Sequence, residues 1–322
     1  MQSRKTSADL WHQKPYYSLD AWCKNTYGRK LYKAALDIGC TCPNRDGTLD
    51  TRGCIFCSAG GSGDFAASRQ LSVTDQLNQA KALLSSKWTP EPGKPSLIAY
   101  FQAYTNTYGD PDRLLSCYEE ALSSPEVAGI SIATRPDCLS DIILEGLDRL
   151  RLLYPDRFIW IELGLQSIHD HTAARIRRGY PTSVFYDAAA KLHARKLPFI
   201  VHLILGLPGE TRLDLQESIR AVNQVHPFGV KLQLLHILKG TDLALLYESG
   251  KLPVLTQEEY LDLLTSCIAA LSPDICLHRI TGDGPRKLLI APQWSLSKRN
   301  VLNRLHALMK QRNLRQGDKI EK

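Results

Sequence analysis

Four of the nine cysteines, Cys40, Cys42, Cys54 and Cys57, fall within a short stretch near the start of the chain. Thiolates are soft ligands that suit zinc and iron–sulfur clusters, and a tight group of cysteines in a reducing compartment indicates metal binding rather than disulfides. All four could close a structural zinc site. Alternatively, Cys42, Cys54 and Cys57 could hold a [4Fe–4S] cluster in which one iron stays open.

The residues beside these cysteines favour the cluster. Phe56 directly precedes the last cysteine, and a glycine-rich stretch, 60–63, follows it; a zinc knuckle needs neither. Other chemistries lack their motifs. The stretch 60–64 has no final glycine of a nucleophile elbow, and the sequence contains no Walker A lysine motif and no His-Glu-x-x-His.

Short apolar runs that alternate with helical patterns predict a parallel α/β sheet. Six such runs occur, at residues 31–38, 97–101, 129–133, 158–163, 199–204 and 230–235. Nearly continuous apolar strands indicate a sheet that is covered on both faces. Six units are too few for a complete eight-unit barrel, so we expect a partly open one. After residue 240 we expect two helices, a strand over 275–280 and a basic helix over 298–312.

Polar residues at the ends of these runs indicate where a site would form. They are Gln102, Thr134, Arg135, Gln166, Gly206 and His236. In parallel α/β folds the site forms at the carboxyl ends of the strands. The cysteine loop follows the first run, so we expect it at the same edge. His169 and His171 match no zinc motif and are expected at the surface.

Positive charge is concentrated at the two ends of the chain. The net charge is +7, with +5 in residues 1–36, +6 in residues 297–322 and −4 between them. This asymmetry suggests a polyanion held by the chain ends, although two solvated amphipathic helices would give the same count. The sequence has no membrane-length apolar run and no secretory signal pattern, which predicts a cytoplasmic protein.

Seven short motifs occur in order along the sequence. They are Cys-Pro-Asn-Arg-Asp-Gly (42–47), Gly-Cys-Ile-Phe-Cys-Ser (53–58), Ala-Tyr-Phe-Gln-Ala-Tyr-Thr-Asn-Thr-Tyr (99–108), Thr-Arg-Pro-Asp (134–137), Glu-Leu-Gly-Leu-Gln-Ser (162–167), Gly-Leu-Pro-Gly-Glu (206–210) and His-Arg-Ile-Thr-Gly-Asp (278–283). Taken together, these motifs resemble the radical S-adenosylmethionine (SAM) enzymes, specifically the YhcC/YtqA-like family related to the catalytic subunit of Elongator. The resemblance runs from about residue 16 to about residue 317.

The resemblance implies an α/β fold with a partial (β/α)6 TIM-like barrel. The basic N-terminal helical segment would span residues 1–30, the radical SAM core 31–240, and a small α/β extension ending in a basic helix 241–322. The family also implies two cofactors, a [4Fe–4S] cluster and SAM. Reductive cleavage of SAM would give a 5′-deoxyadenosyl radical that abstracts a substrate hydrogen, while the protein binds, orients and tunes these groups.

By the same resemblance, particular residues would hold these cofactors. Cys42, Cys54 and Cys57 would bind the cluster, and SAM would chelate the fourth iron. The other cofactor-binding candidates are Phe56 near the adenine, Gln166 and Arg178 at the polar end of SAM, and Glu162, which could equally be a buried ion-pair partner. An arginine suits a carboxylate because its fork is planar and always charged.

The sequence departs from its relatives at two positions. Cys40 stands where relatives usually carry an apolar or aromatic residue, so it is either a bystander or a rival ligand. Ala133 replaces the glutamate of Elongator-type relatives, so a SAM contact from that strand is missing or comes from elsewhere. No acetyltransferase domain follows in this sequence, so Elongator's own carboxymethylation of tRNA uridine is not expected.

Relatives of the YtqA type imply a tRNA substrate, namely the wobble uridine at the step from carboxymethylaminomethyl to aminomethyl. A small metabolite as substrate, or a non-catalytic zinc-stabilised RNA-binding protein, are the alternatives. The electron donor would be a flavodoxin or a ferredoxin. Candidate substrate contacts are Gln102, Tyr104, Asn106, His236, Lys239, Lys298, Arg299 and Arg304.

Overall fold

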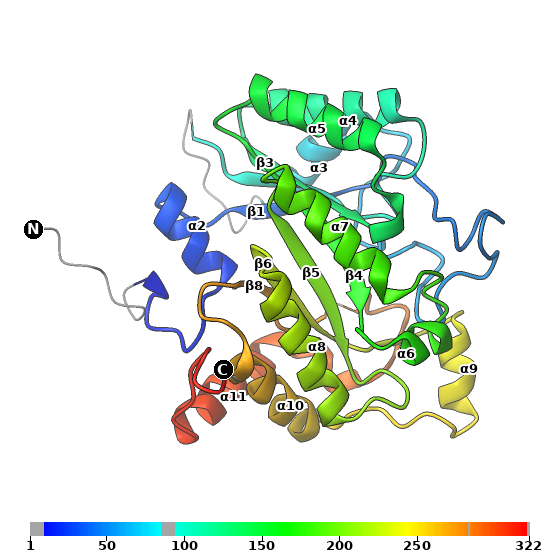
Figure 1. The fold of residues 1–322 in the computed structure, drawn as a ribbon, viewed down its shortest axis with the longest axis vertical. Coiled ribbons are helices and arrows are strands. Elements are labelled where there is room, and N and C mark those ends of the chain that lie inside the picture. Colours follow the sequence, from blue (N-terminus) through cyan, green and yellow to red (C-terminus); the bar gives the residue numbers. More distant parts are fainter. Residues whose placement is uncertain (1–9, 85–93, 283, 321–322) are drawn as a thin grey trace, which may run out of the picture.

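The protein's central feature is a curved parallel sheet, seen in a computed structural model that describes residues 10–84, 94–282 and 284–320 (Figure 1). Within these residues, seven parallel strands lie side by side in one sheet, in the order β1-β2-β3-β4-β5-β6-β8. Their bounds are β1 Tyr32–Leu36, β2 Leu97–Phe101, β3 Val127–Thr134, β4 Phe158–Gln166, β5 Phe199–Leu205, β6 Gly229–Leu234 and β8 Cys276–Arg279. This order is that of a partial TIM barrel, which confirms the predicted fold class.

The seventh strand comes from the predicted C-terminal extension. Val230 of β6 pairs with Leu277 of β8 in parallel register, so this strand continues the core sheet beyond the six predicted units. The sequence showed the apolar run over 275–280 but could not show its partner, because strand pairing is a long-range contact.

Helices cover the outer face of the sheet and bury its apolar side chains. They are α3 Val73–Leu84, α4 Pro111–Ser123, α5 Asp141–Leu153, α7 Thr182–Ala194, α8 Arg212–Val225, α10 Gln257–Ala270 and α11 Lys298–Gln311. Capping residues determine where several of these helices begin. Asp110 caps α4 with Pro111 in the first turn, and Thr211 and Thr256 form capping boxes at α8 and α10.

Helix α2 (Leu19–Tyr27) closes the amino ends of the strands. Its Trp22 packs against Trp160, with ring centroids 4.9 Å apart, and against Phe228 at 5.6 Å. The short helices α6 (Asp170–Arg175) and α9 (Asp242–Glu248) lie on the opposite side of the barrel from α2, at its carboxyl ends (Figure 1). The carboxyl edge therefore remains as the open mouth.

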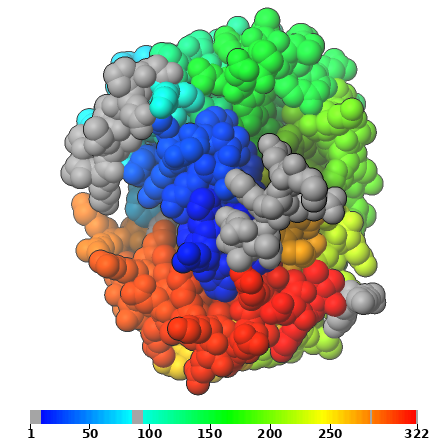
Figure 2. Space-filling view, turned by 90° about the vertical axis from the view of Figure 1, so that its left-hand side faces the viewer, coloured from blue at the N-terminus to red at the C-terminus, as the bar shows by residue number. Residues whose placement is uncertain are grey.

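The two ends of the described chain meet beside α2. The backbone N–H of Gln316 donates to the carbonyl of Pro15 at 2.9 Å, and Tyr16 Oη lies 2.9 Å from His306 Nε2. Figure 2 shows the N-terminal residues in blue directly against the C-terminal residues in red. Residues 1–9 of the predicted basic N-terminal segment lie outside the described residues. In the part of the chain that is described, no helix has the length and apolar character to cross a bilayer.

A small antiparallel ribbon completes the carboxyl edge. Strand β7 (Ile237–Leu238) follows β6 and pairs with β9 (Leu289–Ala291). The backbone N–H of Lys239 donates to the carbonyl of Leu288 at 2.8 Å. The ribbon therefore holds residues 236–239 and 285–291 together at the mouth of the barrel.

Candidate active site at the barrel mouth

A pocket opens where the strands end, as the sequence predicted. It encloses about 920 Å³ of space, a volume that includes open solvent. Its walls come from the cysteine loop and from the ends of β2 to β6 and β8. The lining includes Cys42, Arg45, Cys54, Phe56, Cys57, Tyr100, Gln102, Tyr104, Ala133, Glu162, Gln166, Arg178, His202, Gln233 and Arg279.

The loop that carries Cys42, Cys54 and Cys57 is braced by hydrogen bonds to its own backbone and to the segment after α6. Asn44 Nδ2 donates to the carbonyl oxygens of Arg177 and Arg178, at 2.7 and 3.0 Å. Arg45 Nη2 donates to the carbonyl oxygens of Cys57 and Ser58, at 2.7 and 2.8 Å. These bonds hold the three thiols on one wall of the pocket before any cofactor binds.

The spacing of the thiols separates the two metal hypotheses. A tetrahedral zinc with bonds of about 2.3 Å places its sulfur ligands roughly 4 Å apart. Among the described residues, one group of three His, Cys, Asp or Glu has all its donor atoms within 4.8 Å of one another, and it contains no cysteine. In this structure the sulfur atoms of Cys42, Cys54 and Cys57 therefore do not all lie within 4.8 Å of one another. A cluster, in which each thiolate binds a different iron, suits this wider cage.

The chemistry of the thiols also fits a cluster. Burial raises the pKa of the Cys54 thiol to about 12, so this thiol stays protonated near neutral pH unless a cation binds it. The Arg45 guanidinium beside Cys57 supplies one positive charge, although burial still raises the pKa of that thiol. Iron would supply the rest. Cys42, Cys54 and Cys57, which line the pocket, would hold it.

Cys40 is separated from this wall. Its side chain is buried in the main hydrophobic core and does not line the pocket. Burial raises the pKa of the Cys40 thiol to about 11. The structure therefore places Cys40 among the core side chains rather than with the three pocket thiols.

Gln166 and Phe56 both face the pocket. Gln166 ends β4 with a left-handed backbone, φ +63°, and its buried Oε1 has no hydrogen-bond partner among the described residues. A buried amide oxygen without a partner is costly, so this atom favours a ligand that donates a hydrogen bond. Phe56 also lines this pocket. Both positions fit a bound SAM.

The surroundings of Arg178 differ from the prediction that it holds the carboxylate of SAM. Its side chain is almost fully buried, and all its N–H groups already have acceptors. Nη1 donates to the carbonyls of Leu165 and Ser167, at 2.8 and 2.6 Å, while Nη2 donates to Thr182 Oγ1 at 2.9 Å and Nε to the carbonyl of Tyr180 at 3.2 Å. Arg178 thus positions the segment that carries Gln166.

Glu162 is the centre of a buried charge network under the pocket. Its carboxylate accepts from Lys33 Nζ at 2.7 Å, Ser131 Oγ at 2.6 Å and His202 Nε2 at 2.8 Å, and it pairs with Lys231. Burial alone would raise the pKa of Glu162, but the ammonium groups of Lys231 and Lys33 hold it well below its usual value. Glu162 is therefore a buried ion-pair partner, which is one of its two predicted roles, and it also lines the pocket.

The sequence reasoning missed the partners of Glu162. Lys33, His202 and Lys231 each interrupt an otherwise apolar strand, and that interruption was the available signal. A charged side chain in a buried strand needs a partner inside the barrel. Burial lowers the pKa of His202 to about 4, so this ring is neutral at pH 7.

Three of the predicted substrate residues line a cavity, and the other five do not. Gln102 and Tyr104 line the pocket, and His236 lines a second cavity beside it. Asn106 does not line either cavity; it donates to the carbonyls of Phe101 and Ala133, both at 3.0 Å, and so holds the loop after β2. Lys239 is exposed next to the second cavity. Lys298, Arg299 and Arg304 lie on α11, outside both cavities, and Arg304 pairs with Glu258.

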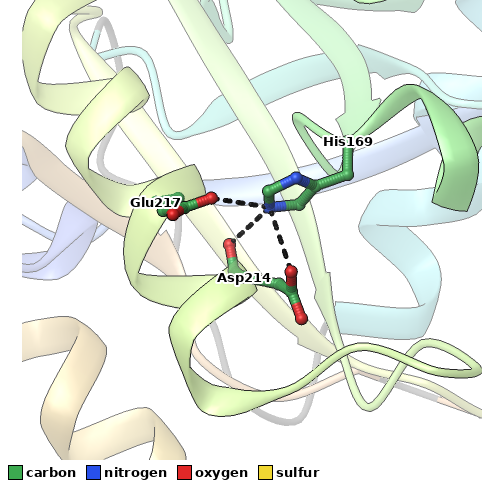
Figure 3. A group of neighbouring side chains, drawn as sticks. All are labelled: His169, Asp214 and Glu217. Atoms are coloured by element: carbon green, nitrogen blue, oxygen red, sulfur yellow. Dashed lines mark hydrogen bonds and ion pairs between the residues drawn. The ribbon is translucent and has the colours of Figure 1, made fainter.

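His169, predicted at the surface, contacts two acidic residues of α8 (Figure 3). Its Nε2 lies 3.5 Å from Glu217 Oε2, 3.7 Å from Asp214 Oδ1 and 3.0 Å from the Asp214 carbonyl oxygen. The contact with a carbonyl requires a proton on Nε2, because a carbonyl oxygen only accepts. That nitrogen then has no lone pair for a metal, and the contact joins the loop after β4 to α8.

These features define the class of protein. A Radical SAM superfamily profile matches residues 42–222, and a Radical_SAM C-terminal domain profile matches residues 227–311. The chain belongs to the radical SAM superfamily, whose members bind a [4Fe–4S] cluster and SAM.

Among its relatives, the uncharacterised protein YtqA of Bacillus subtilis is 41% identical, over 95% of this chain and 92% of YtqA. Protein YhcC of Escherichia coli K12 is 36% identical, over 83% of this chain and 84% of YhcC. The solved structure of Elp3 from the archaeon Methanocaldococcus infernus has a similar fold, with a TM-score of 0.65 at 16% identity. That similarity covers 89% of this chain and 64% of Elp3.

Proposed function

We propose that this radical SAM enzyme acts on the 5-position side chain of wobble uridine in tRNA, at the step from carboxymethylaminomethyl to aminomethyl. The observation that carries the radical SAM part of the proposal is that Cys42, Cys54 and Cys57 line one cavity at the barrel mouth together with Gln166, whose Oε1 has no partner among the described residues. The ordered motifs shared with the YhcC/YtqA-like family support the choice of substrate.

The residues of the pocket have distinct tasks in this proposal. When bound, the cluster and SAM supply a radical that abstracts a hydrogen atom from the substrate. Cys42, Cys54 and Cys57 hold the cluster, Gln166 accepts a hydrogen bond from SAM, and Phe56 packs near its adenine. Gln102 and Tyr104 line the remaining wall, where the uridine side chain would enter. A flavodoxin or a ferredoxin would supply the electron.

Mass spectrometry of tRNA nucleosides tests the substrate. A strain without this gene should accumulate carboxymethylaminomethyl uridine and lack the products made from aminomethyl uridine, and a plasmid-borne copy should restore them. The Cys57→Ala variant is the matched control, since it should fold but fail to restore the product. An unchanged nucleoside profile in the deletion strain would exclude this substrate and favour the alternative of a small metabolite.

A further inference from the structure

A second cavity lies beside the first at the barrel mouth. The two cavities adjoin, because eight residues line both of them, among them Phe56, Cys57 and Gln166. The second cavity lies between the end of the cysteine loop, residues 56–65, and the β7–β9 ribbon, where Leu238, Gly282 and Pro285 complete its wall. A substrate that extends out of the first cavity into the second would lie against this ribbon.

Phe65 is exposed at the edge of the second cavity. It lines the cavity, and 54% of its surface remains accessible. The loop that carries it is anchored by Ser58 Oγ, which donates to Asp64 Oδ2 at 2.9 Å. An exposed aromatic ring on an anchored loop offers a flat face to a planar ligand, and every nucleobase has such a face.

Three exposed basic side chains lie next to this cavity, on the segments that form the β7–β9 ribbon. Lys239 directly follows the lining residue Leu238, and Arg286 and Lys287 directly follow the lining residue Pro285. The hydrogen bond from Lys239 N–H to the Leu288 carbonyl brings the two segments together. In the described part of the chain, no carboxylate forms an ion pair with any of these three side chains. We call Lys239, Arg286 and Lys287 the rim cations.

We propose that Phe65 and the rim cations form a docking site for single-stranded RNA next to the target nucleotide. Phe65 stacks on a neighbouring base, and the rim cations contact the flanking phosphates. This inference rests on the proposed function, because it assumes that the target nucleotide is part of an RNA chain. A nucleotide turned into the pocket must leave its backbone across the rim, so contacts there add affinity at the reacting position.

The surrounding charge also fits RNA. From residue 285 to residue 299, which includes the mouth end of α11, the sequence holds four Lys or Arg and no acidic residue. An acidic electron-donor protein is the other partner that a basic surface could attract. The rim cations adjoin residues that line the second cavity, and the exposed ring of Phe65 lines the same cavity. An aromatic ring together with separated cations is typical of single-strand binding. RNA is therefore the partner that we propose.

The test compares two triple variants with the reconstituted wild-type protein. Lys239→Gln, Arg286→Gln and Lys287→Gln together remove the rim cations. The matched control, Arg149→Gln, Arg157→Gln and Lys196→Gln, removes the same charge around α5 and the starts of β4 and β5, away from the mouth. Binding of unmodified tRNA and of an anticodon stem-loop is measured from low to high salt, together with binding of flavodoxin.

The rim variant should bind the stem-loop at least about tenfold more weakly at low salt. The salt slope, the change of log affinity with log salt, should fall by about two units, at about 0.7 per lost contact on single-stranded RNA. The control should keep both values. A rim variant that binds RNA like the wild-type protein would overturn the proposal, as would a variant that loses only flavodoxin. If the wild-type protein itself binds no RNA, the tRNA function fails and the docking site fails with it.

A single substitution tests the stacking role without changing charge. Phe65→Leu should weaken stem-loop binding about tenfold with an unchanged salt slope, and Phe65→Tyr should restore it, because leucine keeps an apolar side chain but loses the flat face. Equal affinity in all three proteins would remove Phe65 from the site. Thermal unfolding and the visible spectrum of the cluster confirm that each variant is folded and loaded.

Discussion

At the scale of single residues, we expect opposite effects on cluster binding from substitutions of the three pocket cysteines and of Cys40. Cys42→Ala, Cys54→Ala or Cys57→Ala should each abolish cluster binding and SAM cleavage, because three thiolates are the minimum that hold the cage. Cys40→Ala should keep about four irons per chain and should still cleave SAM, since its thiol lies in the core. Iron analysis and the 5′-deoxyadenosine yield measure both effects. Loss of iron from the Cys40 variant would contradict this ligand assignment.

Arg178 distinguishes a structural role from direct cofactor binding. Lysine keeps the charge but cannot reach the acceptors that the guanidinium satisfies, namely the carbonyls of Leu165, Ser167 and Tyr180 and the hydroxyl of Thr182. Buried acceptors that lose a donor are destabilising, so Arg178→Lys should lower the free energy of unfolding by about 2 kcal/mol or more. Chemical denaturation and SAM titration are measured together. Weaker SAM binding at unchanged stability would instead support a direct contact.

His202 predicts how stability depends on pH. Burial lowers the pKa of its ring to about 4 from an ordinary value of 6.5, so the unfolded chain binds the extra proton first as the pH falls. The folded protein should therefore lose stability from about pH 6.5 down to about pH 4, by up to about 3 kcal/mol. His202→Gln keeps a donor for Glu162 but cannot titrate. Its unfolding free energy should depend less steeply on pH over that range, and an identical slope would exclude His202 as the cause.

At the scale of elements, α2 stabilises the barrel from the edge opposite the site. Trp22 packs its ring against Trp160, Phe158 and Phe228 at the amino ends of the strands. Trp22→Ala should lower the free energy of unfolding by about 3 kcal/mol, because it leaves a large cavity. The SAM dissociation constant of the folded variant should stay at the wild-type value. A variant with normal stability and weak SAM binding would show that α2 acts on the site and not on the barrel.

At the scale of the whole molecule, the course of α11 divides the basic C-terminal end into two parts. The helix begins near the mouth, where Trp294 Nε1 donates to the Leu255 carbonyl and Leu255 borders Gly206 at the end of β5. It ends near the amino edge, where Gln316 Nε2 donates to the carbonyl of Ile275, just before β8. The predicted tRNA contacts therefore lie at different distances from the pocket.

This course predicts unequal effects of charge removal along α11. Lys298→Gln with Arg299→Gln should weaken tRNA binding and lower its salt slope by between one and two units, at about 0.7–0.9 per lost contact. Lys310→Gln with Arg312→Gln should change both much less. Filter binding over a salt series measures the two pairs. Equal losses from both pairs would indicate that tRNA extends along the whole helix, and no loss from either would leave α11 as a solvated face.

The sequence alone determined the features that depend on local pattern. The grouping of the cysteines indicated a metal site, and the resemblance to the radical SAM enzymes implied Cys42, Cys54 and Cys57 as the cluster ligands. Apolar runs predicted six strands and the edge at which the site forms. These features can be predicted from the sequence because they depend on residue types and on short spacings along the chain.

Only the tertiary structure decided which distant residues meet. It added β8 to the sheet as a seventh strand, joined Glu162 to Lys33, His202 and Lys231, enclosed Arg178 in backbone carbonyls, and brought the chain ends together at the amino edge. Each of these contacts joins residues whose separation along the chain carries no periodic signal. Strand pairing, burial and hydrogen bonding specify such contacts only once the whole barrel has folded.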